Sequence, residues 1–399
     1  MHASMAGRFL MTHDVSDLCI GKPPLRWLPP SSTVAHALAE LDGGGPDAAV
    51  AVWDGAAAKG PADVAGRVRM ADVLLFLCAD GAGGNNIASP AAALQATLAD
   101  LLAAAGTEAP PVRRVEPHAS VLEAVDALLG GAQTLVVPIQ DKTRRAAMCW
   151  LTVEDVVRFF LGSIALFSPT ASCSVSDLGV VRPATAFSVA ATDDALSAVV
   201  RAGLAMHASV AVVSGRRLEG EISASTLSSL DAPVAAAAFT VLSAGELASF
   251  VDSGRARQEA ALRVVRSRLH RRNLHGMLDL LDGNDPLSPS SSSTSSSPFS
   301  SSSSSEDDDD DEENNQAPPY STSQACRNGL WSKGRRAARE PITCRRGSSL
   351  VAMMAQAVTH RVTQVWVVDD DDQLLGVVGF LDVLRVLRRH LLAAPPAPI

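Results

Sequence analysis

The sequence contains few aromatic residues: phenylalanine, tryptophan and tyrosine together make up 4% of its 399 residues. Hydrophobic residues nevertheless account for 47% of the chain, a share typical of globular proteins. The core must therefore be built mainly from alanine, valine and leucine. A chain of this length is long enough for two or three compact domains, each of which buries a core of its own.

The sequence also lacks an excess of basic charge. Its formal net charge is −9, and the unbroken acidic run Glu306–Glu313 accounts for nearly all of it. A nucleic-acid-binding protein normally carries a basic face, so we expect no nucleic-acid partner. No stretch approaches the ~18 uninterrupted apolar residues that span a bilayer, and the N-terminus shows no secretory signal. We expect an intracellular protein without membrane contact, in the cytoplasm by default or in the nucleus if the basic segment Lys333–Arg346 acts as a signal.

Motifs of metal binding and catalysis are missing as well. The six cysteines are scattered without C-x-x-C spacing, which indicates free thiols in a reducing compartment and not a metal site. None of the nine histidines belongs to an H-E-x-x-H motif, and no G-x-S-x-G nucleophile motif is present. The sequence therefore predicts that the protein is not an enzyme.

A short motif occurs twice, 160 residues apart. His13–Pro23 reads HDVSDLCIGKP and Cys173–Pro183 reads CSVSDLGVVRP, so Val-Ser-Asp-Leu, a basic residue and a proline occupy matching positions. A threonine suited to capping a helix follows each copy, at Thr33 and at Thr192. Agreement over so many ordered features indicates that the chain consists of two related halves.

Each half contains two copies of one pattern, in which a helix, an apolar strand, a polar turn and a second strand precede a short amphipathic helix. Units of this type are α+β and cover one face of a small sheet with helices. A predicted helical segment, which includes one continuous helix over 258–281, joins the third unit to the fourth. The predicted boundaries are four units at 13–80, 111–169, 173–231 and 341–392, a helical connector at 232–282 and an insert at 283–340.

The insert is dominated by Ser288–Pro319, which is rich first in serine and then in acidic residues. It cannot bury enough apolar surface to offset the entropy of ordering, so it is predicted to be disordered. Acid-directed kinases favour serines that precede an acidic run, and each phosphate would add about two negative charges. The serines in this position are Ser302, Ser303, Ser304 and Ser305. The alternative interpretation is a solvated spacer.

The motifs resemble those of CBS domains, and in particular those of plant proteins with four CBS domains. The resemblance covers nearly the whole chain apart from the predicted insert. It implies β-α-β-β-α units that pack in pairs, unit one with two and unit three with four, as two Bateman-type modules. The matching segments are Val15–Pro23, Val137–Ile139, Cys149–Asp155, Gly220–Ser223, Ala357–Val362 and Trp366–Val368.

The resemblance also implies where a ligand would bind. In CBS domains a G-x-φ-[ST]-x-x-D motif, in which φ is an apolar residue, joins the last strand to the last helix. Its hydroxyl contacts a nucleotide phosphate or ribose at the helix N-terminus, and its aspartate accepts both ribose hydroxyls. Unit two keeps both polar members, Thr152 and Asp155. The other units keep fewer: Asp72 with Arg69 in the hydroxyl position, Ser223 with Thr226 in the aspartate position, and Asp382 with Gly379 in the hydroxyl position.

Two functions remain open at this level. The first is a non-enzymatic sensor in which AMP, ADP, ATP or S-adenosylmethionine occupies these sites and changes how the protein acts on a client protein. The second is a ligand-free scaffold, or an interaction protein that resembles the γ-type subunits of energy-sensing kinases. Under the second, Thr152 and Asp155 only cap a helix. Dimerisation through paired CBS units is compatible with both.

Four consecutive aspartates, Asp369–Asp372, lie between two apolar runs of the fourth unit. Acidic residues suit a solvated turn, and adjacent carboxylates lack the alternating spacing of a calcium-binding loop. We therefore predict a structural turn here and no metal site.

Overall fold

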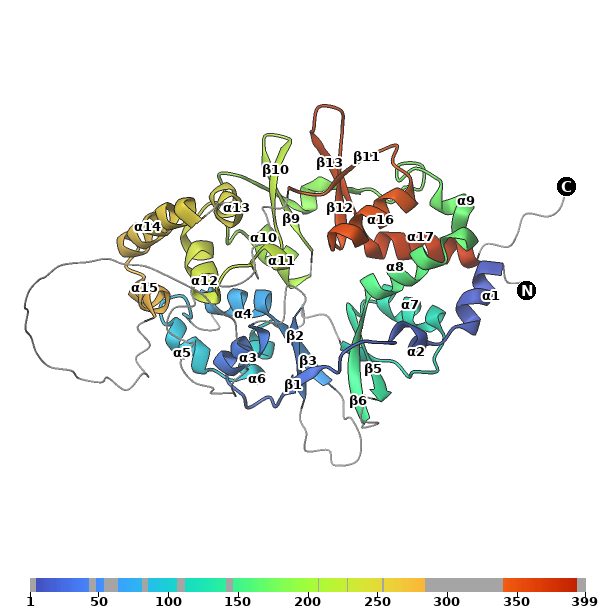
Figure 1. Cartoon of the computed structure of the whole chain (residues 1–399). Coiled ribbons are helices and arrows are strands. Elements are labelled where there is room, and N and C mark those ends of the chain that lie inside the picture. Colours follow the sequence, from blue (N-terminus) through green and yellow to red (C-terminus); the bar gives the residue numbers. More distant parts are fainter. Residues whose placement is uncertain are drawn as a thin grey trace, which may run out of the picture.

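The computed structural model describes residues 5–42, 48–53, 64–80, 85–105, 112–140, 146–206, 208–227, 229–252, 255–283 and 340–392. The predicted insert, with Ser302–Ser305, lies outside these ranges except at its two end residues. Within them the fold is α+β, with small sheets in the middle of the molecule and helices on its two sides (Figure 1).

Four segments share the order strand, helix, strand, strand, helix. Unit one consists of β1 (Arg26–Leu28), α3 (Val34–Leu41), β2 (Ala49–Trp53), β3 (Val64–Arg69) and α4 (Met70–Leu77). Unit two consists of β4 (Val112–Arg114), α7 (Val121–Leu129), β5 (Thr134–Gln140), β6 (Ala146–Thr152) and α8 (Val153–Gly162). Unit three consists of β8 (Ser188–Ala190), α10 (Ala198–Ala205), β9 (Val210–Ser214), β10 (Arg217–Ile222) and α11 (Ala224–Leu227). Unit four consists of β11 (Thr343–Arg345), α16 (Leu350–His360), β12 (Gln364–Val368), β13 (Leu374–Gly379) and α17 (Phe380–Leu392).

In each unit the first strand is parallel to the second, and the second and third form an antiparallel hairpin. The residue patterns alone predict only the hairpin, because each first strand is three residues long and so short a strand has no detectable period. The strands of the hairpins are mostly buried runs of valine, leucine and alanine, as the low aromatic content requires.

The remaining helices precede or follow these units. They are α1 (Met5–Thr12), α2 (Val15–Leu18), α5 (Pro90–Gln95), α6 (Leu98–Ala105), α9 (Ser168–Ala171), α12 (Ala232–Val241), α13 (Ala244–Asp252), α14 (Arg255–Arg271) and α15 (His275–Asp282), with 3-10 turns η2 (Ile164–Phe167) and η3 (Ala184–Ala186). The prediction of one helix over 258–281 was wrong, since Asn273 adopts a left-handed conformation (φ 56°) between α14 and α15.

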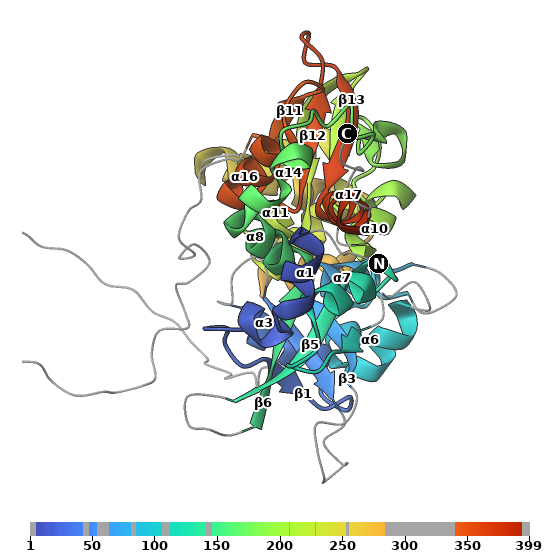
Figure 2. The same cartoon turned by 90° about the vertical axis from the view of Figure 1, so that its right-hand side faces the viewer.

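Two hydrophobic cores hold the units together across the two halves of the chain. One core joins unit one to unit three around α12, whose described residues are nearly all buried. The other joins unit two to unit four, with α7 and α8 packed against α16 and α17. Figure 2 shows the strands of units one and two below and those of unit four above, with helices such as α8 and α17 between them. Helices therefore make the contact between the two halves.

The sheets make the contact within each half. In the second half Trp366, Leu374 and Val377 pack with Ala211 of unit three, and Trp366 Nε1 donates to Glu221 at 2.9 Å. In the first half the Leu25 N–H donates to the Met148 carbonyl at 2.7 Å. Each half is therefore a pair of units joined through their sheets.

The repeated Val-Ser-Asp-Leu motif crosses from one unit to the other in its half. The Val15 N–H donates to the Ala119 carbonyl at 2.8 Å, just before α7 of unit two. The Val175 N–H donates to the Ser348 carbonyl at 2.9 Å, just before α16 of unit four. The two copies therefore have the same structural task, which is to cover the start of a helix in units two and four.

The two predicted threonine caps differ in outcome. Thr33 caps α3, because its hydroxyl accepts the His36 N–H at 3.2 Å. Thr192 does not cap a helix: α10 begins six residues later, with Ser197 at its N-cap. The intervening Asp194 instead bridges to Ser243, at the start of α13. The caps Thr33, Ser120 and Ser349 of the other units make the same kind of bridge, so the position equivalent to a cap in unit three is Asp194 and not Thr192.

Candidate functional site at the helix N-termini

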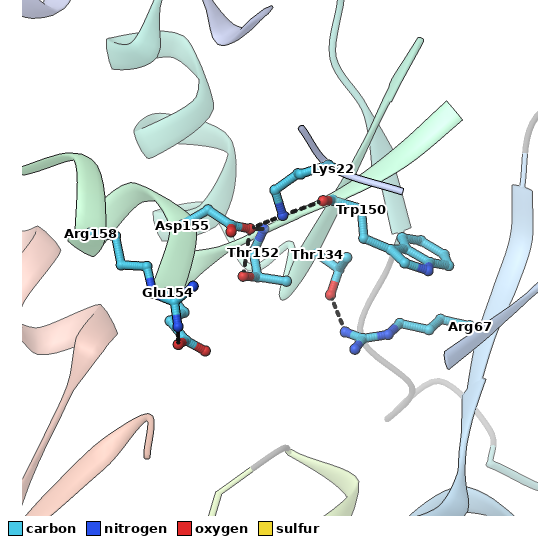
Figure 3. Close-up of polar contacts among 8 residues, drawn as sticks. All are labelled: Lys22, Arg67, Thr134, Trp150, Thr152, Glu154, Asp155 and Arg158. Carbon is cyan, nitrogen blue, oxygen red and sulfur yellow. Dashed lines mark hydrogen bonds and ion pairs between the residues drawn. The ribbon is translucent and has the colours of Figure 1, made fainter. Parts of the chain in front are cut away.

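The Thr152 and Asp155 pair lies where β6 runs directly into α8. Asp155 Oδ2 accepts the Thr152 N–H at 2.7 Å and the Thr152 hydroxyl at 2.8 Å. It also accepts the Lys22 ammonium at 2.6 Å, and that ammonium donates to the Trp150 carbonyl at 2.9 Å (Figure 3). The Asp155 side chain is 16% exposed. The two polar residues therefore form a helix cap that a cation of the same chain closes.

Asp382 is held in a closely similar way at the start of α17. Its Oδ2 accepts the Gly379 N–H at 3.0 Å and Arg182 Nε at 2.8 Å, and its Oδ1 accepts Arg385 Nη1 at 2.8 Å. A side chain at Gly379 would lie 3.1 Å from Arg182 Nη2, so the guanidinium fills the space of the missing hydroxyl. Where the motif would offer Asp382 a hydroxyl group, this unit has Gly379, and Arg182 takes the place of the hydroxyl as the partner of Asp382.

Lys22 and Arg182 are the basic residues that the two copies of the motif share, and they stand 160 residues apart. Each pairs with the aspartate at the start of the last helix of the unit that its motif covers. Sequence reasoning found these residues as repeat members and missed their partners. The signal was present: a basic residue at the same position of both copies implies a shared acidic partner.

Units one and three differ from this arrangement. In unit one Arg69 donates Nε and Nη2 to the two oxygens of Asp72, at 3.0 and 2.7 Å, and the Arg69 N–H donates to Asp72 at 2.8 Å. The Arg69 side chain is 9% exposed, so its guanidinium is committed to the carboxylate and does not project toward a phosphate. In unit three Ser223 and Thr226 bond only through hydroxyl and backbone groups, with Thr226 N–H donating to Ser223 Oγ at 3.2 Å.

The structure does not bring the predicted ligand residues together in one site. They occupy equivalent positions in four separate units, and each of the three aspartates has a cation of the same chain as its partner. A ribose diol would therefore have to displace Arg69 from Asp72 or an arginine from Asp382, whereas at Asp155 it would share the carboxylate with Lys22, which occupies Oδ2.

An open cleft of about 970 Å³ adjoins the Lys22 side of this arrangement. Its walls are the loop after α2, which contributes Cys19–Pro24, and the end of β5, which contributes Pro138–Gln140. Most of these residues are apolar, and Lys22 is the one charged residue among those that line the cleft in the described chain. Thr152 and Asp155 lie behind Lys22 and are absent from its walls.

The space between the sheets of units one and two holds a further polar contact. Arg67 of β3 donates to the Thr134 hydroxyl at 2.5 Å and lies over the ring of Trp150, 5.5 Å from its centroid (Figure 3). A guanidinium on an indole face gains cation–π energy in such a half-buried setting. This contact joins the two units of the first half.

The turn at Asp369–Asp372 is structural, as predicted. Asp369 Oδ1 accepts the N–H groups of Asp371 and Gln373 at 3.1 and 2.8 Å, and Asp372 is left-handed (φ 58°). Among the residues described, no group of three or more His, Cys, Asp or Glu side chains has the spacing of a metal site. No helix in the described ranges is long and apolar enough to cross a membrane.

The comparisons with known proteins agree with these features. The CBS domain family model matches residues 337–389. The CBS domain-containing protein CBSX5 of Arabidopsis thaliana is 36% identical over 96% of this chain and 98% of its own length. CBSX6 of the same plant is 28% identical over 63% of this chain and 54% of its own length. The SNF1-related protein kinase regulatory subunit gamma-like PV42b is 40% identical over 14% of this chain and 16% of its own length.

Among solved structures, a Methanocaldococcus jannaschii protein proposed to be an archaeal homologue of g-AMPK matches with a TM-score of 0.52. It is 15% identical, and the match covers 94% of this chain and 99% of that chain, so it supports the fold alone. The likeness to CBSX5 extends over nearly the full length of both chains. The chain belongs to the CBS domain-containing protein family of plants.

Proposed function

We propose that this chain is a non-catalytic regulatory protein that acts by binding a partner protein through four CBS units. The units pair through their sheets, one with two and three with four, and the helices join the two pairs. One observation carries the proposal: the chain's own cations occupy every aspartate of the motif that would hold a ribose. Each aspartate thus forms an ion pair within the chain, and we call such a carboxylate–cation pair a structural latch.

The domain limits proposed from the sequence need one addition. Units at 13–80, 111–169, 173–231 and 341–392, with a helical connector at 232–282, fit the order of elements. The motif copies at 15–18 and 175–178 contact units two and four, so we assign them to those units in function. The motif copy at 15–18 precedes unit one but completes unit two, and the copy at 175–178 precedes unit three but completes unit four. This arrangement supports the proposal that each half acts as one module.

The partner we propose is a protein kinase complex. The support is the 58-residue likeness to a gamma-like regulatory subunit. The test is co-expression of the full chain with the remaining subunits of an SNF1-related kinase, followed by affinity purification and native mass measurement. A stoichiometric complex would support a kinase partner. Separate elution of the chain under conditions that assemble the other subunits would reject it.

A second candidate is a sensor of adenosine-type ligands such as AMP, ADP, ATP or S-adenosylmethionine. The observation that favours it is the cleft beside Lys22, whose ammonium is placed to meet a phosphate. On this proposal the ligand draws Lys22 away from Asp155, and Thr152 and Asp155 then become free to bind it. The change in the latch would alter the packing of α2 on unit two.

Calorimetric titration with the four ligands separates the two candidates. The variants are Asp155→Ala and, as a matched control, Asp100→Ala, which removes an exposed capping aspartate that no cation contacts in the described structure. Absence of heat and of thermal shift for every ligand supports the interaction protein. Binding that is lost in Asp155→Ala and kept in Asp100→Ala supports the sensor and overturns the first proposal.

A further inference from the structure

A groove lies on the surface between unit three and the connector helices. Its volume is about 990 Å³, and its walls come from the loop after β8, from β10, from α13 and from α14. Helix α13 contacts the sheet of unit three and also α14, so it lies between them (Figure 1). Ser223 and Thr226, the motif residues of unit three, are not among the described residues that line the groove. The groove is therefore separate from the candidate site at the helix N-termini.

Helix α14 has two faces with different tasks. The face that packs into the core is formed by Leu262, Val265 and Leu269. The residues that line the groove follow one another at spacings of three, four and three along the helix: Ala261, Val264, Arg268 and Arg271. Side chains at these spacings share one face of a helix. This second face has the pattern against which another helix packs, and core packing leaves it open in the described chain.

The groove exposes apolar surface that the fold does not need. Val264 is 42% exposed and stands in the wall of the groove, on the opposite side of α14 from its core face. The apolar residues Leu242 and Phe250, which are 4% and 3% exposed, also line the groove. Apolar surface of this kind gains free energy when a partner covers it.

The α14 side of the groove carries positive charge that no carboxylate balances. Arg268 is neutralised, because it donates to both oxygens of Glu246. Arg271 is exposed and has no side-chain partner among the described residues, and Arg272 donates to the Thr240 carbonyl at 3.1 Å. A backbone carbonyl carries no net charge, so two full positive charges remain on this border of the groove.

The border that belongs to unit three carries the opposite charge. Asp194, in the loop before α10, and Glu219 of β10 both line the groove and are exposed. Neither carboxylate forms an ion pair within the described chain. These carboxylates would repel a small anion that Arg271 attracts. The groove therefore suits an occupant with both signs of charge, separated by an apolar stripe.

We propose that this groove binds an amphipathic helix of the partner protein. The apolar stripe of that helix covers Val264 and the apolar surface beside it. Acidic residues on one border of the stripe meet Arg271 and Arg272, and basic residues on the other border meet Asp194 and Glu219. The inference rests on the proposed function of the chain as a partner-binding protein, and it adds the surface and the chemistry of the segment that binds there.

The test is a titration of the full-length protein into a fluorescein-labelled synthetic helical peptide, followed by fluorescence anisotropy. The peptide carries leucine at heptad positions a and d, glutamate at every e and lysine at every g. The control peptide has the same composition in scrambled order, which destroys the apolar stripe. We expect saturable binding of the first peptide alone, and weaker binding at high salt. Absence of binding, or equal binding of both peptides, would overturn the proposal.

Exposed residues provide variants that leave the fold intact, which thermal melting checks. Val264→Asp should weaken binding of the striped peptide about tenfold or more, because an unpaired carboxylate would be covered. Arg271→Glu should weaken it about five- to tenfold, and Arg271→Lys should keep most of the affinity. The matched controls lie outside the groove and should bind as the wild type does: Met206→Asp, at a hydrophobic residue that is 56% exposed, and Arg263→Glu, at an exposed arginine of α14. Unchanged binding in both Val264→Asp and Arg271→Glu contradicts the proposal.

Co-expression with the kinase subunits separates failure of this inference from failure of the proposed function. Assembly that is lost in Val264→Asp and kept in Met206→Asp supports both. Assembly that Val264→Asp leaves intact supports the proposed function and refutes the groove as the binding surface. Absence of assembly in the wild type, with peptide binding intact, rejects the kinase partner and supports the groove.

Two other occupants of the groove would give distinct results. A wild-type dimer that Val264→Asp dissociates would show that a second copy of the chain fills the groove. Tighter peptide binding after replacement of Glu306–Glu313 by serine would show that the chain's own acidic run fills it. Either result overturns the proposal.

Discussion

Removal of the Asp382 carboxylate should destabilise unit four by a measurable amount. In Asp382→Ala the helix α17 loses the acceptor for the Gly379 N–H, an interaction worth about 1 kcal/mol at a helix N-terminus. Arg182 and Arg385 also lose their partner, but their side chains are 38% and 53% exposed, so solvent limits each ion pair to roughly 0.5–1 kcal/mol. The expected total is about 2–3 kcal/mol of unfolding free energy.

The measurement is urea unfolding followed by tryptophan fluorescence, since Trp366 is fully buried in unit four. Asp382→Asn keeps an oxygen acceptor and loses the charge, so it should cost about half as much. Arg345→Ala breaks the exposed pair with Asp372 and is the matched control, expected to cost less than about 0.5 kcal/mol.

A double-mutant cycle then isolates the contact between Arg182 and Asp382. The coupling between Arg182→Ala and Asp382→Ala should be about 0.5–1 kcal/mol, because the two side chains interact directly through one hydrogen-bonded ion pair. An Asp382→Ala cost no larger than that of Arg345→Ala would refute the view that the aspartate is a structural latch.

Three further predictions concern other contacts. Arg268 donates to both oxygens of Glu246, at 2.5 and 2.6 Å, and these bonds lower the Glu246 pKa to about 2. The stabilisation from this ion pair is therefore present above about pH 4.5 and is lost as the pH falls toward 2. Glu246→Gln should flatten the profile of thermal stability against pH in that range, and an unchanged profile would contradict this. Gly376→Ala should lower the free energy of urea unfolding by about 1–3 kcal/mol, because the new Cβ meets the Arg182 carbonyl of β7 (Arg182–Pro183). The control Gly162→Ala places its Cβ in open space and should be near neutral. Equal costs for the two variants would contradict the close approach of β7. Trp366→Phe should lower the free energy of unfolding by about 1–3 kcal/mol in the same assay, because Glu221 loses the indole N–H donor. A cost well below that of Gly376→Ala would show that this hydrogen bond does not join units three and four.

Much of the architecture could be read from local patterns. The apolar strands, the polar turns and the Asp369–Asp372 turn depend on residues close in sequence, so periodicity and turn chemistry predicted them. The first strands of the units escaped detection because three residues carry no period. The placement of Thr192 was predicted wrongly, because the position equivalent to the caps of the other units is Asp194, two residues further along the chain.

The residues of the candidate site were likewise predicted only in part from the sequence. The sequence by itself determined the repeat, the aspartates at the helix starts and the basic residue shared by Lys22 and Arg182. Only the tertiary structure decided that these belong together, because Lys22 meets Asp155 across 133 residues and Arg182 meets Asp382 across 200. An ion pair depends on distance in space, and no local rule of propensity or spacing fixes which remote carboxylate a cation will reach.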